Sequence, residues 1–526
     1  MSPAGGLPHR RPMQTHSAKL SRAPNPIDAS PVLGGVRYQR HRPEDTALYR
    51  LVEQYFPAFQ RRLAERERAL PGFVLDEFRS YLACGRMEHG FVRVKCDGCR
   101  HELLVAFSCK KRGFCPSCGA RRMVETAAHL VDHVIPRLPV RQWVLSVPWP
   151  LRMLFAARPD ALTRCLDVVV RSIETHLLQR AGLRRASGAR TGVVTLIQRH
   201  GSAANLNVHL HMLVLDGVVE PIGEQVRFRP LSAPSEAQLQ SVLTRLIARI
   251  LRRLTKDGWL SQDTEPPSLD LEPRDVIDEL AAASIRYRIA DGPGVGQRTL
   301  TLRSPSLARP STPKSLTADL QGFSLNAAVA CSAVQRNRLE RLARYVARPA
   351  IALERLAVDP AGRVVLELTH PFRDGTTHML FSPEDWLARL AALVPRPRAH
   401  LTRYHGVFAP NYRLRRRVVP SPPGAATRKR RQCKVSEASS PPNPPALNDD
   451  GRHLAPMTWA ERLRRVFEID ITTCPDCGGR LRWIADITEP ALIRKILLHV
   501  QSRAPPCRGF PDATLPGTDA QFTLAG

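Results

Sequence analysis

The chain has 526 residues and a formal net charge of +30, because 78 Lys and Arg outnumber 48 Asp and Glu. A positive excess of this size indicates a polyanionic partner, most simply nucleic acid, although an arginine-biased composition alone would give a basic surface. No apolar run reaches the roughly eighteen residues that cross a membrane, and the N-terminal segment lacks the apolar core of a signal sequence. We therefore expect an intracellular protein, cytoplasmic and nucleoid-associated in a bacterium, whose twelve cysteines are metal ligands and not disulfides.

The N-terminal part divides into a tail and a cysteine-rich domain. Residues 1–43 are rich in Pro, Gly, Ser and Arg, so we expect a disordered tail. Residues 46–69 have helical periodicity, and Pro57 is expected to bend or split that helix. Cysteines crowd residues 84–122, and another helix is expected over 119–135. We assign 44–135 to an N-terminal helix and zinc-binding domain.

Two Cys-x-x-Cys pairs stand in this domain, Cys96 with Cys99 and Cys115 with Cys118. Chance predicts roughly a quarter of one such pair in a chain of this composition, whereas the chain has three. The turn of each pair directs two thiolates at one centre, so we expect these four cysteines to form a closed, structural zinc site. The two other cysteines of the block are alternative ligands, either of which can replace one of the four: Cys84 and Cys109.

Basic residues between the two pairs suit contact with DNA phosphates better than the reading of bases. They are Lys110, Lys111 and Arg112. The alternative is a zinc-stabilised small domain whose charges are only solvated.

Residues 136–414 alternate strands and helices, as expected of an α+β domain. Strands are expected at 141–148, 191–201 and 207–219, and the last two should form an antiparallel hairpin because their connection is short. Helices are expected at 161–182, 235–257, 333–347 and 383–394, with a second hairpin over 363–370 and 377–382. Residues 262–320 are rich in Pro, Gly and Ser, and we expect them to be irregular.

The strand expected over 207–219 carries two histidines, His209 and His211, on either side of a leucine. Residues i and i+2 of a strand point to the same face, so both imidazoles project together and can bind a divalent cation. Chance predicts roughly half of one such spacing in this chain, so the pair alone is also compatible with two packed strand histidines. A third ligand is expected from the preceding strand, and Gln198 is preferred. The alternatives are His200, Asn205 and Asn207. An open site of this kind suits Mg²⁺ or Mn²⁺ and a phosphate oxygen.

Tyr345 is the candidate nucleophile, because a tyrosine can form a covalent phosphoester. It lies on the helix expected over 333–347, where Arg341, Arg344 and Arg348 flank it. Residues three and four apart share a helix face, so Arg341 and Arg348 lie beside Tyr345, where cations favour the phenolate and can hold a DNA phosphate. The alternative is a tyrosine packed on the core with its arginines in solvent.

The C-terminal part contains the third Cys-x-x-Cys pair, Cys474 with Cys477. Residues 415–455 are expected to be a basic, Pro- and Ser-rich linker, 456–505 a small C-terminal unit, and 506–526 a tail. The sequence shows no obvious second pair to complete this one. A zinc site at the third pair and a pair without metal are therefore equally well supported. Its weak partner candidates are Cys433, His499 and Cys507.

Several segments together resemble the IS91 family of rolling-circle transposases, in the one-tyrosine variant similar to the transposases of common-region elements. In chain order they are SCKKRGFCPSCGARR, TLIQRHGS, NLNVHLHMLVLDGVV, RYVARPAIALERL, HPFRDGTTH, HLTRYHGVFAPN and CPDCGGRLRWIA.

The resemblance implies an HUH endonuclease, whose central antiparallel sheet with packed helices carries the pair His209 and His211, and whose nucleophile is Tyr345. It implies cleavage of one strand of single-stranded DNA at element ends with a divalent metal. Many members carry a second tyrosine one helical turn away, whereas this chain has Arg341 and Pro349 at those positions. The alternatives are a plasmid replication initiator or relaxase, and a zinc-dependent DNA-binding protein without chemistry.

Overall fold

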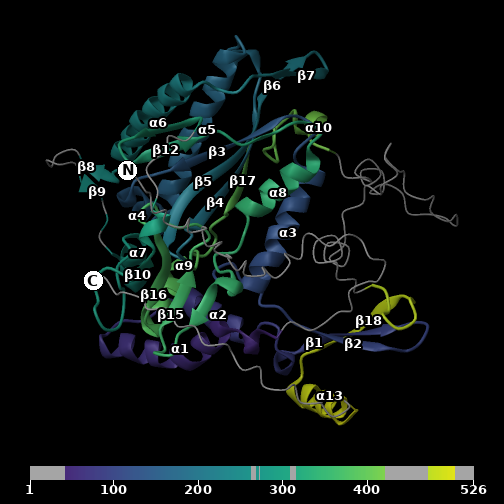
Figure 1. Ribbon diagram of the computed structural model, residues 1–526. Coiled ribbons are helices and arrows are strands. Elements are labelled where there is room, and N and C mark those ends of the chain that lie inside the picture. The colour runs from purple at the N-terminus through teal and green to yellow at the C-terminus, as the bar shows by residue number, and fades with distance from the viewer. Residues whose placement is uncertain are drawn as a thin grey trace, which may run out of the picture.

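The computed structural model describes residues 42–261, 268–269, 271, 273–308, 315–420 and 472–503 (Figure 1). The fold is α+β, as the sequence predicted, and the strand pairs of the described residues are antiparallel. Nearly all of the expected tail and most of the expected linker lie outside the described residues, as do Cys433 and Cys507. Among the helices of the described part, none is long and apolar enough to cross a membrane.

A seven-stranded sheet occupies the centre, in the order β11-β12-β3-β5-β4-β17, with β13 also paired to β3. Its strands are β3 (Val140–Ser146), β4 (Gly192–His200), β5 (Leu206–Leu215), β11 (Thr317–Leu320), β12 (Phe323–Asn326), β13 (Ala330–Cys331) and β17 (Thr402–Gly406). The predicted hairpin is confirmed: β4 pairs with β5, and Gln198 lies opposite His209.

Helices cover both faces of this sheet, because apolar side chains project from both sides of its strands. Trp143, Leu210 and Met212 pack on one face against α4 (Trp149–Ala157), α5 (Pro159–Arg180) and α6 (Glu236–Lys256). Val194 and Leu213 pack on the other face against α3 (Pro116–His133) and α8 (Arg336–Val346). Figure 1 shows α3 and α8 side by side there. Since side chains alternate along β5, the two histidines share this second face with Leu213.

A second core joins four helices to a four-stranded sheet, in the order β10-β16-β15-β14. The elements are α1 (Ala47–Glu65), α2 (Gly72–Ala83), α7 (Val276–Ile285), α9 (Pro383–Leu393), β10 (Leu300–Arg303), β14 (Leu356–Val358), β15 (Val364–Glu367) and β16 (Thr376–Phe381). α1 continues through Pro57 as one helix, so of the two predicted effects, a bend or a split, the split does not occur. Phe56, beside this proline, stacks on Phe78 of α2 with ring centroids 4.3 Å apart, which holds the helix in place.

Residues 262–320 contain more regular structure than we expected. α7, β10 and β11 all lie in this range, so the prediction of an irregular segment is wrong for them. α7 buries Val276, Ile277 and Leu280 in the second core, and packing there outweighs the Pro- and Gly-rich flanks.

The small C-terminal unit docks on the N-terminal domain. β1 (Phe91–Cys96) pairs on one side with β2 (Glu102–Ala106) and on the other with β18 (Leu481–Ile487), which α13 (Pro490–Arg503) follows. Figure 1 shows the yellow C-terminal strand beside the blue hairpin. The remaining short elements are β6 (Gly217–Ile222), β7 (Gln225–Pro230), β8 (Leu260–Ser261), β9 (Ser268–Leu269) and α10 (Arg415–Val418).

Candidate functional site

The histidine pair lies in the middle of β5, opposite the part of β4 that contacts the C-terminus of α8. The two imidazole rings have centroids 4.8 Å apart. His209 Nδ1 lies 2.8 Å from the carbonyl oxygen of Asn207. Because a carbonyl only accepts hydrogen bonds, Nδ1 carries the proton and Nε2 keeps the lone pair that a metal needs.

Gln198 lies between the histidines and α8. Its Oε1 is 3.2 Å from His211 Nε2, and its Nε2 donates to the carbonyl oxygen of Val346 at 3.2 Å. The side chain therefore presents its oxygen toward the imidazoles while its nitrogen is held by the helix that carries Tyr345. The other ring nitrogen of His211 lies 2.8 Å from the amide nitrogen of Gln142 on β3. Sequence reasoning missed Gln142, since only the pairing of β3 with β5 brings it to this face.

The imidazoles are neutral at pH 7. Burial lowers the pKa of His209 to about 4 and the pKa values of His200 and His211 to about 3, and the Arg348 cation acts in the same direction. Neutral imidazole is the form that binds metals. Among the described residues, no third His, Cys, Asp or Glu gathers with the pair. The amide oxygen of Gln198 is therefore the protein group best placed to complete a donor set of two nitrogens and one oxygen.

Tyr345 lies on the last turn of α8, directly before Val346, which contacts Gln198 of β4. Its side chain is 56% exposed. The guanidinium of Arg348 stands 4.2 Å from the centre of its ring. Arg341 is exposed one turn earlier on α8, whereas Arg344 forms an ion pair with the buried Glu340. Arg341 and Arg348 thus keep charge available beside the tyrosine, and the charge of Arg344 is already balanced.

A cavity of about 310 Å³ lies between the end of β4, the segment after α8 and the cysteine-rich block, and His209, His211 and Tyr345 do not line it. Gln198, His200 and Arg348 line it from one side, and Lys111 and Arg112 line it from the other. Lys111 also pairs with Asp76, and Arg112 donates to the carbonyl oxygen of Ala399 at 2.7 Å. Lys110 does not line this cavity; it is exposed and has a left-handed backbone with φ of 55°.

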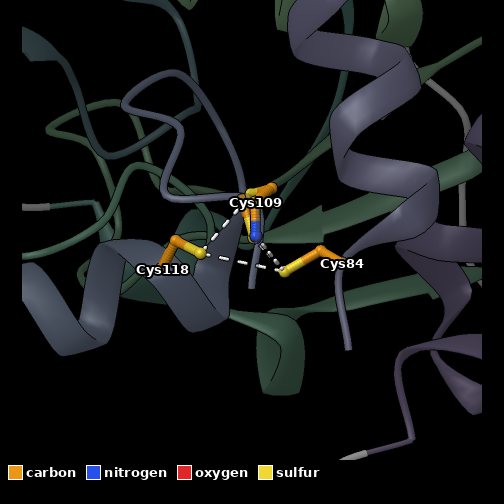
Figure 2. A group of neighbouring side chains, drawn as sticks. Cys84, Cys109 and Cys118 are labelled. Atoms are coloured by element: carbon orange, nitrogen blue, oxygen red, sulfur yellow. Dashed lines mark hydrogen bonds between the residues drawn. The ribbon is translucent and has the colours of Figure 1, made fainter. Parts of the chain in front are cut away.

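The structure separates the four cysteines that we expected to share one zinc. Cys115 and Cys118, at the start of α3, gather with Cys84 and Cys109, and their four thiol groups lie within 4.8 Å of one another. Figure 2 shows three of these side chains pointing toward one another. Sγ of Cys109 is 3.4 Å, and Sγ of Cys84 3.7 Å, from Sγ of Cys118. Both cysteines that the sequence offered as alternatives thus join this cluster.

Cys96 and Cys99 belong to a different group. They lie at the turn of the β1–β2 hairpin, which extends away from α3 and carries them to Cys474 and Cys477. The predicted pairing of Cys96 and Cys99 with Cys115 and Cys118 is therefore wrong.

Two family models match the chain. Residues 51–147 match the model described as "Transposase zinc-binding domain", of the IS91 type, and residues 192–416 match the model described as "Putative transposase". Neither the comparison with curated proteins nor that with solved structures gave a match.

A zinc-binding domain followed by a transposase domain defines a DNA-transposing enzyme. The chain belongs to the IS91 family of transposases. The cluster of Cys84, Cys109, Cys115 and Cys118 fits the structural Zn²⁺ site of the zinc-binding domain, because four thiolates form a closed tetrahedral shell.

Proposed function

We propose that this transposase cuts and rejoins one DNA strand through a 5′-phosphotyrosine on Tyr345. The observation that carries the proposal is the contact between α8 and the histidine-bearing hairpin. Gln198 of β4 donates to the carbonyl oxygen of Val346, the residue after Tyr345, and His200 Nε2 lies 3.3 Å from the carbonyl oxygen of Arg348. The residue directly after Tyr345 therefore contacts Gln198, one of the proposed metal ligands.

The chemistry is a transesterification. The phenolic oxygen of Tyr345 attacks the phosphorus, the bond from phosphorus to the 3′ oxygen breaks, and the proton lost by the phenol ends on the released 3′-hydroxyl. The new bond keeps the energy of a phosphoester, so a 3′-hydroxyl can later reverse the step and join strands. The chain accordingly requires no nucleotide as an energy source.

His209, His211 and Gln198 would hold a Mg²⁺ or Mn²⁺ ion. Two neutral imidazoles and an amide oxygen lie together here. The amide oxygen, with phosphate and water oxygens, suits either cation, and the imidazoles favour Mn²⁺ over Mg²⁺. When bound, a divalent cation supplies charge that polarises the scissile phosphate. The carbonyl oxygen of Asn207 accepts from Nδ1 of His209 and orients that imidazole, and the side-chain amide of Gln142 contacts Nδ1 of His211. Metal binding through Nε2 of His211 would need its proton on Nδ1, with the oxygen of the Gln142 amide turned to accept it.

The DNA strand would follow the cavity between the zinc-binding domain and α8. Arg112 brings positive charge to one wall and Arg348 to the other, whereas the charge of Lys111 is balanced by Asp76. Lys110 and Arg341 extend the basic surface around them. Cations that follow a backbone, together with an exposed aromatic ring such as that of Tyr345, suit a single strand better than a duplex.

The proposal is tested with a single-stranded oligonucleotide that spans an element end, incubated with Mn²⁺ or Mg²⁺. A covalent protein–DNA product should form and migrate as a heavier band under denaturing conditions. Tyr345→Phe should abolish it, and Tyr412→Phe is the matched control, because its hydroxyl contacts Gly188 through a 3.4 Å hydrogen bond away from the histidines. An adduct formed at the wild-type level by Tyr345→Phe would refute the assignment of the nucleophile.

The metal is tested separately. His209→Ala and His211→Ala should abolish metal-dependent cleavage while the folded protein still binds the oligonucleotide, since binding depends on the basic residues. Metal-dependent cleavage that survives both substitutions would place the cation elsewhere.

A further inference from the structure

A second four-cysteine group lies at the junction between the two ends of the described chain. Cys96 and Cys99 come from the β1–β2 turn, and Cys474 and Cys477 come from the turn before β18. Sγ of Cys96 lies 3.4 Å from Sγ of Cys477, and Sγ of Cys99 lies 3.5 Å from Sγ of Cys474. The shortest contacts therefore join one pair to the other across 381 and 375 positions of the sequence.

In each pair a backbone N–H is directed at a cysteine sulfur, within the turn for Cys96 and after the turn for Cys477. The N–H of Gly98 donates to Sγ of Cys96 at 3.3 Å, and the N–H of Gly479 donates to Sγ of Cys477 at 3.4 Å. Amide groups that point at sulfur favour the thiolate, which is the form that binds metal.

The two turns approach each other too closely for ordinary side chains. A Cβ at Gly479 would lie 3.0 Å from Sγ of Cys96 and 3.2 Å from Sγ of Cys477. The turns are also tied directly, because the N–H of Asp97 donates to the carbonyl oxygen of Arg480 at 3.1 Å. The four sulfurs are thus brought together by a fitted backbone and not by mobile side chains.

The spacing of the sulfurs suits a metal and not a disulfide. A disulfide has a sulfur–sulfur distance of about 2.05 Å, whereas the short contacts here are 3.4 and 3.5 Å. Zinc–sulfur bonds of about 2.3 Å place tetrahedral sulfurs about 3.8 Å apart, and all four thiols here fall within 4.8 Å of one another. Cys96 and Cys474 are 1% and 2% exposed, whereas Cys99 and Cys477 are exposed, so the group has one buried side and one side that faces solvent.

We propose that Cys96, Cys99, Cys474 and Cys477 bind a second structural Zn²⁺, which fastens the C-terminal unit to the N-terminal zinc-binding domain. The family matches cover residues 51–147 and 192–416, so half of this ligand set lies beyond them. The zinc-binding domain is thereby discontinuous in sequence, since its second metal is completed by residues that follow the transposase domain.

The apolar contacts of this unit explain why it needs a metal. In the described part of this unit, the buried hydrophobic side chains that join β1, β18 and α13 are Phe91, Ile487 and Ile493, and Leu481 is buried beside Cys96 and Cys474. A core this small does not offset the conformational entropy of ordering two strands and a helix. A four-thiolate zinc site contributes folding free energy directly, and in small domains it replaces a hydrophobic core.

The test measures metal content in the full chain purified under reducing conditions. Elemental analysis should find two zinc ions per chain, and the double variant Cys474→Ser with Cys477→Ser should retain one. The matched control is Cys165→Ala, a buried cysteine of α5 outside both groups, which should keep two. One zinc in the wild type, or two in the double variant, would overturn the proposal.

Two further measurements test the second zinc site even if the double variant folds poorly. Hydrogen exchange of the wild type should accelerate over β1 and β18 on slow chelation, with β5 unchanged at first, and exchange that does not respond would contradict the fastening role. Thiol titration of the unfolded chain, without added reductant, should find all twelve cysteines free. Two or four missing thiols in the wild type, with all ten remaining cysteines free in the double variant, would show disulfides instead. These measurements do not depend on DNA cleavage, so their outcome is separate from that of the proposed function.

Discussion

Gly119 connects the first cysteine cluster to the segment that follows Tyr345. It follows Cys118 in α3, and a Cβ at this position would lie 2.6 Å from Cβ and 3.4 Å from Cα of Pro349. Pro349 comes directly after Arg348, whose guanidinium covers the tyrosine ring. The substitution Gly119→Ala should therefore displace the segment that positions Tyr345.

The structure sets the size of this effect. Ordinary van der Waals contact begins near 3.4 Å, so a contact of 2.6 Å requires a movement of about 0.8 Å, and because Pro349 presents a rigid ring it must move with its backbone. Overpacking of this kind lowers the free energy of unfolding by about 1–3 kcal/mol. The higher helix propensity of alanine over glycine raises it by about 1 kcal/mol. The net loss of stability should be about 0–2 kcal/mol. A misplacement near 1 Å lowers a rate by about 10²-fold, so we expect adduct formation to slow by roughly 10- to 100-fold.

The assay combines the rate of covalent protein–DNA formation with thermal unfolding of the same samples. Gly72→Ala is the control, because it lies at the start of α2 and its added Cβ meets nothing within 4 Å. It should keep the wild-type rate. If Gly119→Ala is folded and forms the adduct as fast as the wild type, the contact with Pro349 does not position the tyrosine and the reasoning fails.

Three further outcomes follow from particular side chains. Arg141 forms a buried ion pair with Asp216 through two hydrogen bonds of 2.7 and 3.0 Å. Arg141→Met leaves that carboxylate buried without its partner, so the free energy of unfolding measured by denaturant titration should fall by about 3–5 kcal/mol. A loss below about 1 kcal/mol would contradict this expectation. Burial lowers the pKa of His176 from 6.5 to about 4. As the pH falls, the unfolded chain therefore takes up a proton on this histidine before the folded chain does. The free energy of unfolding should decrease between about pH 6.5 and 4, by at most about 3 kcal/mol. His176→Phe should remove that part of the pH dependence in unfolding measured across this range, and an unchanged profile would exclude His176 as its source. Arg348→Gln should weaken binding of single-stranded DNA and reduce its salt dependence by about one phosphate contact, whereas Arg344→Gln should have a smaller effect because Glu340 already balances its charge; equal effects in a salt titration would contradict the distinction.

The parts of the site that the sequence predicted are those set by local rules. The alternation along β5 places His209 and His211 on one face, and the short connection to β4 fixes the hairpin that brings Gln198 opposite His209. Gln142 follows no such rule, because β3 is separated from β5 by two helices and a strand. Tertiary packing likewise decided the continuity of α1 through Pro57, which the residue's own preference opposed.

The cysteines show that sequence spacing can identify metal ligands without showing which of them share one metal ion. In chain order, Cys84 belongs to the first cluster, Cys96 and Cys99 to the second, and Cys109, Cys115 and Cys118 to the first again. The β1–β2 hairpin leaves the first cluster after Cys84 and returns to it at Cys109, so neighbours in sequence are separated by the length of a strand. Pairing the two nearest Cys-x-x-Cys motifs assumes that the chain between them closes a single loop. Here that chain forms two strands, whose backbone hydrogen bonds hold Cys96 and Cys99 at the far end of the hairpin, and only the strand pairing of β1 with β18 supplies the partners that complete their set.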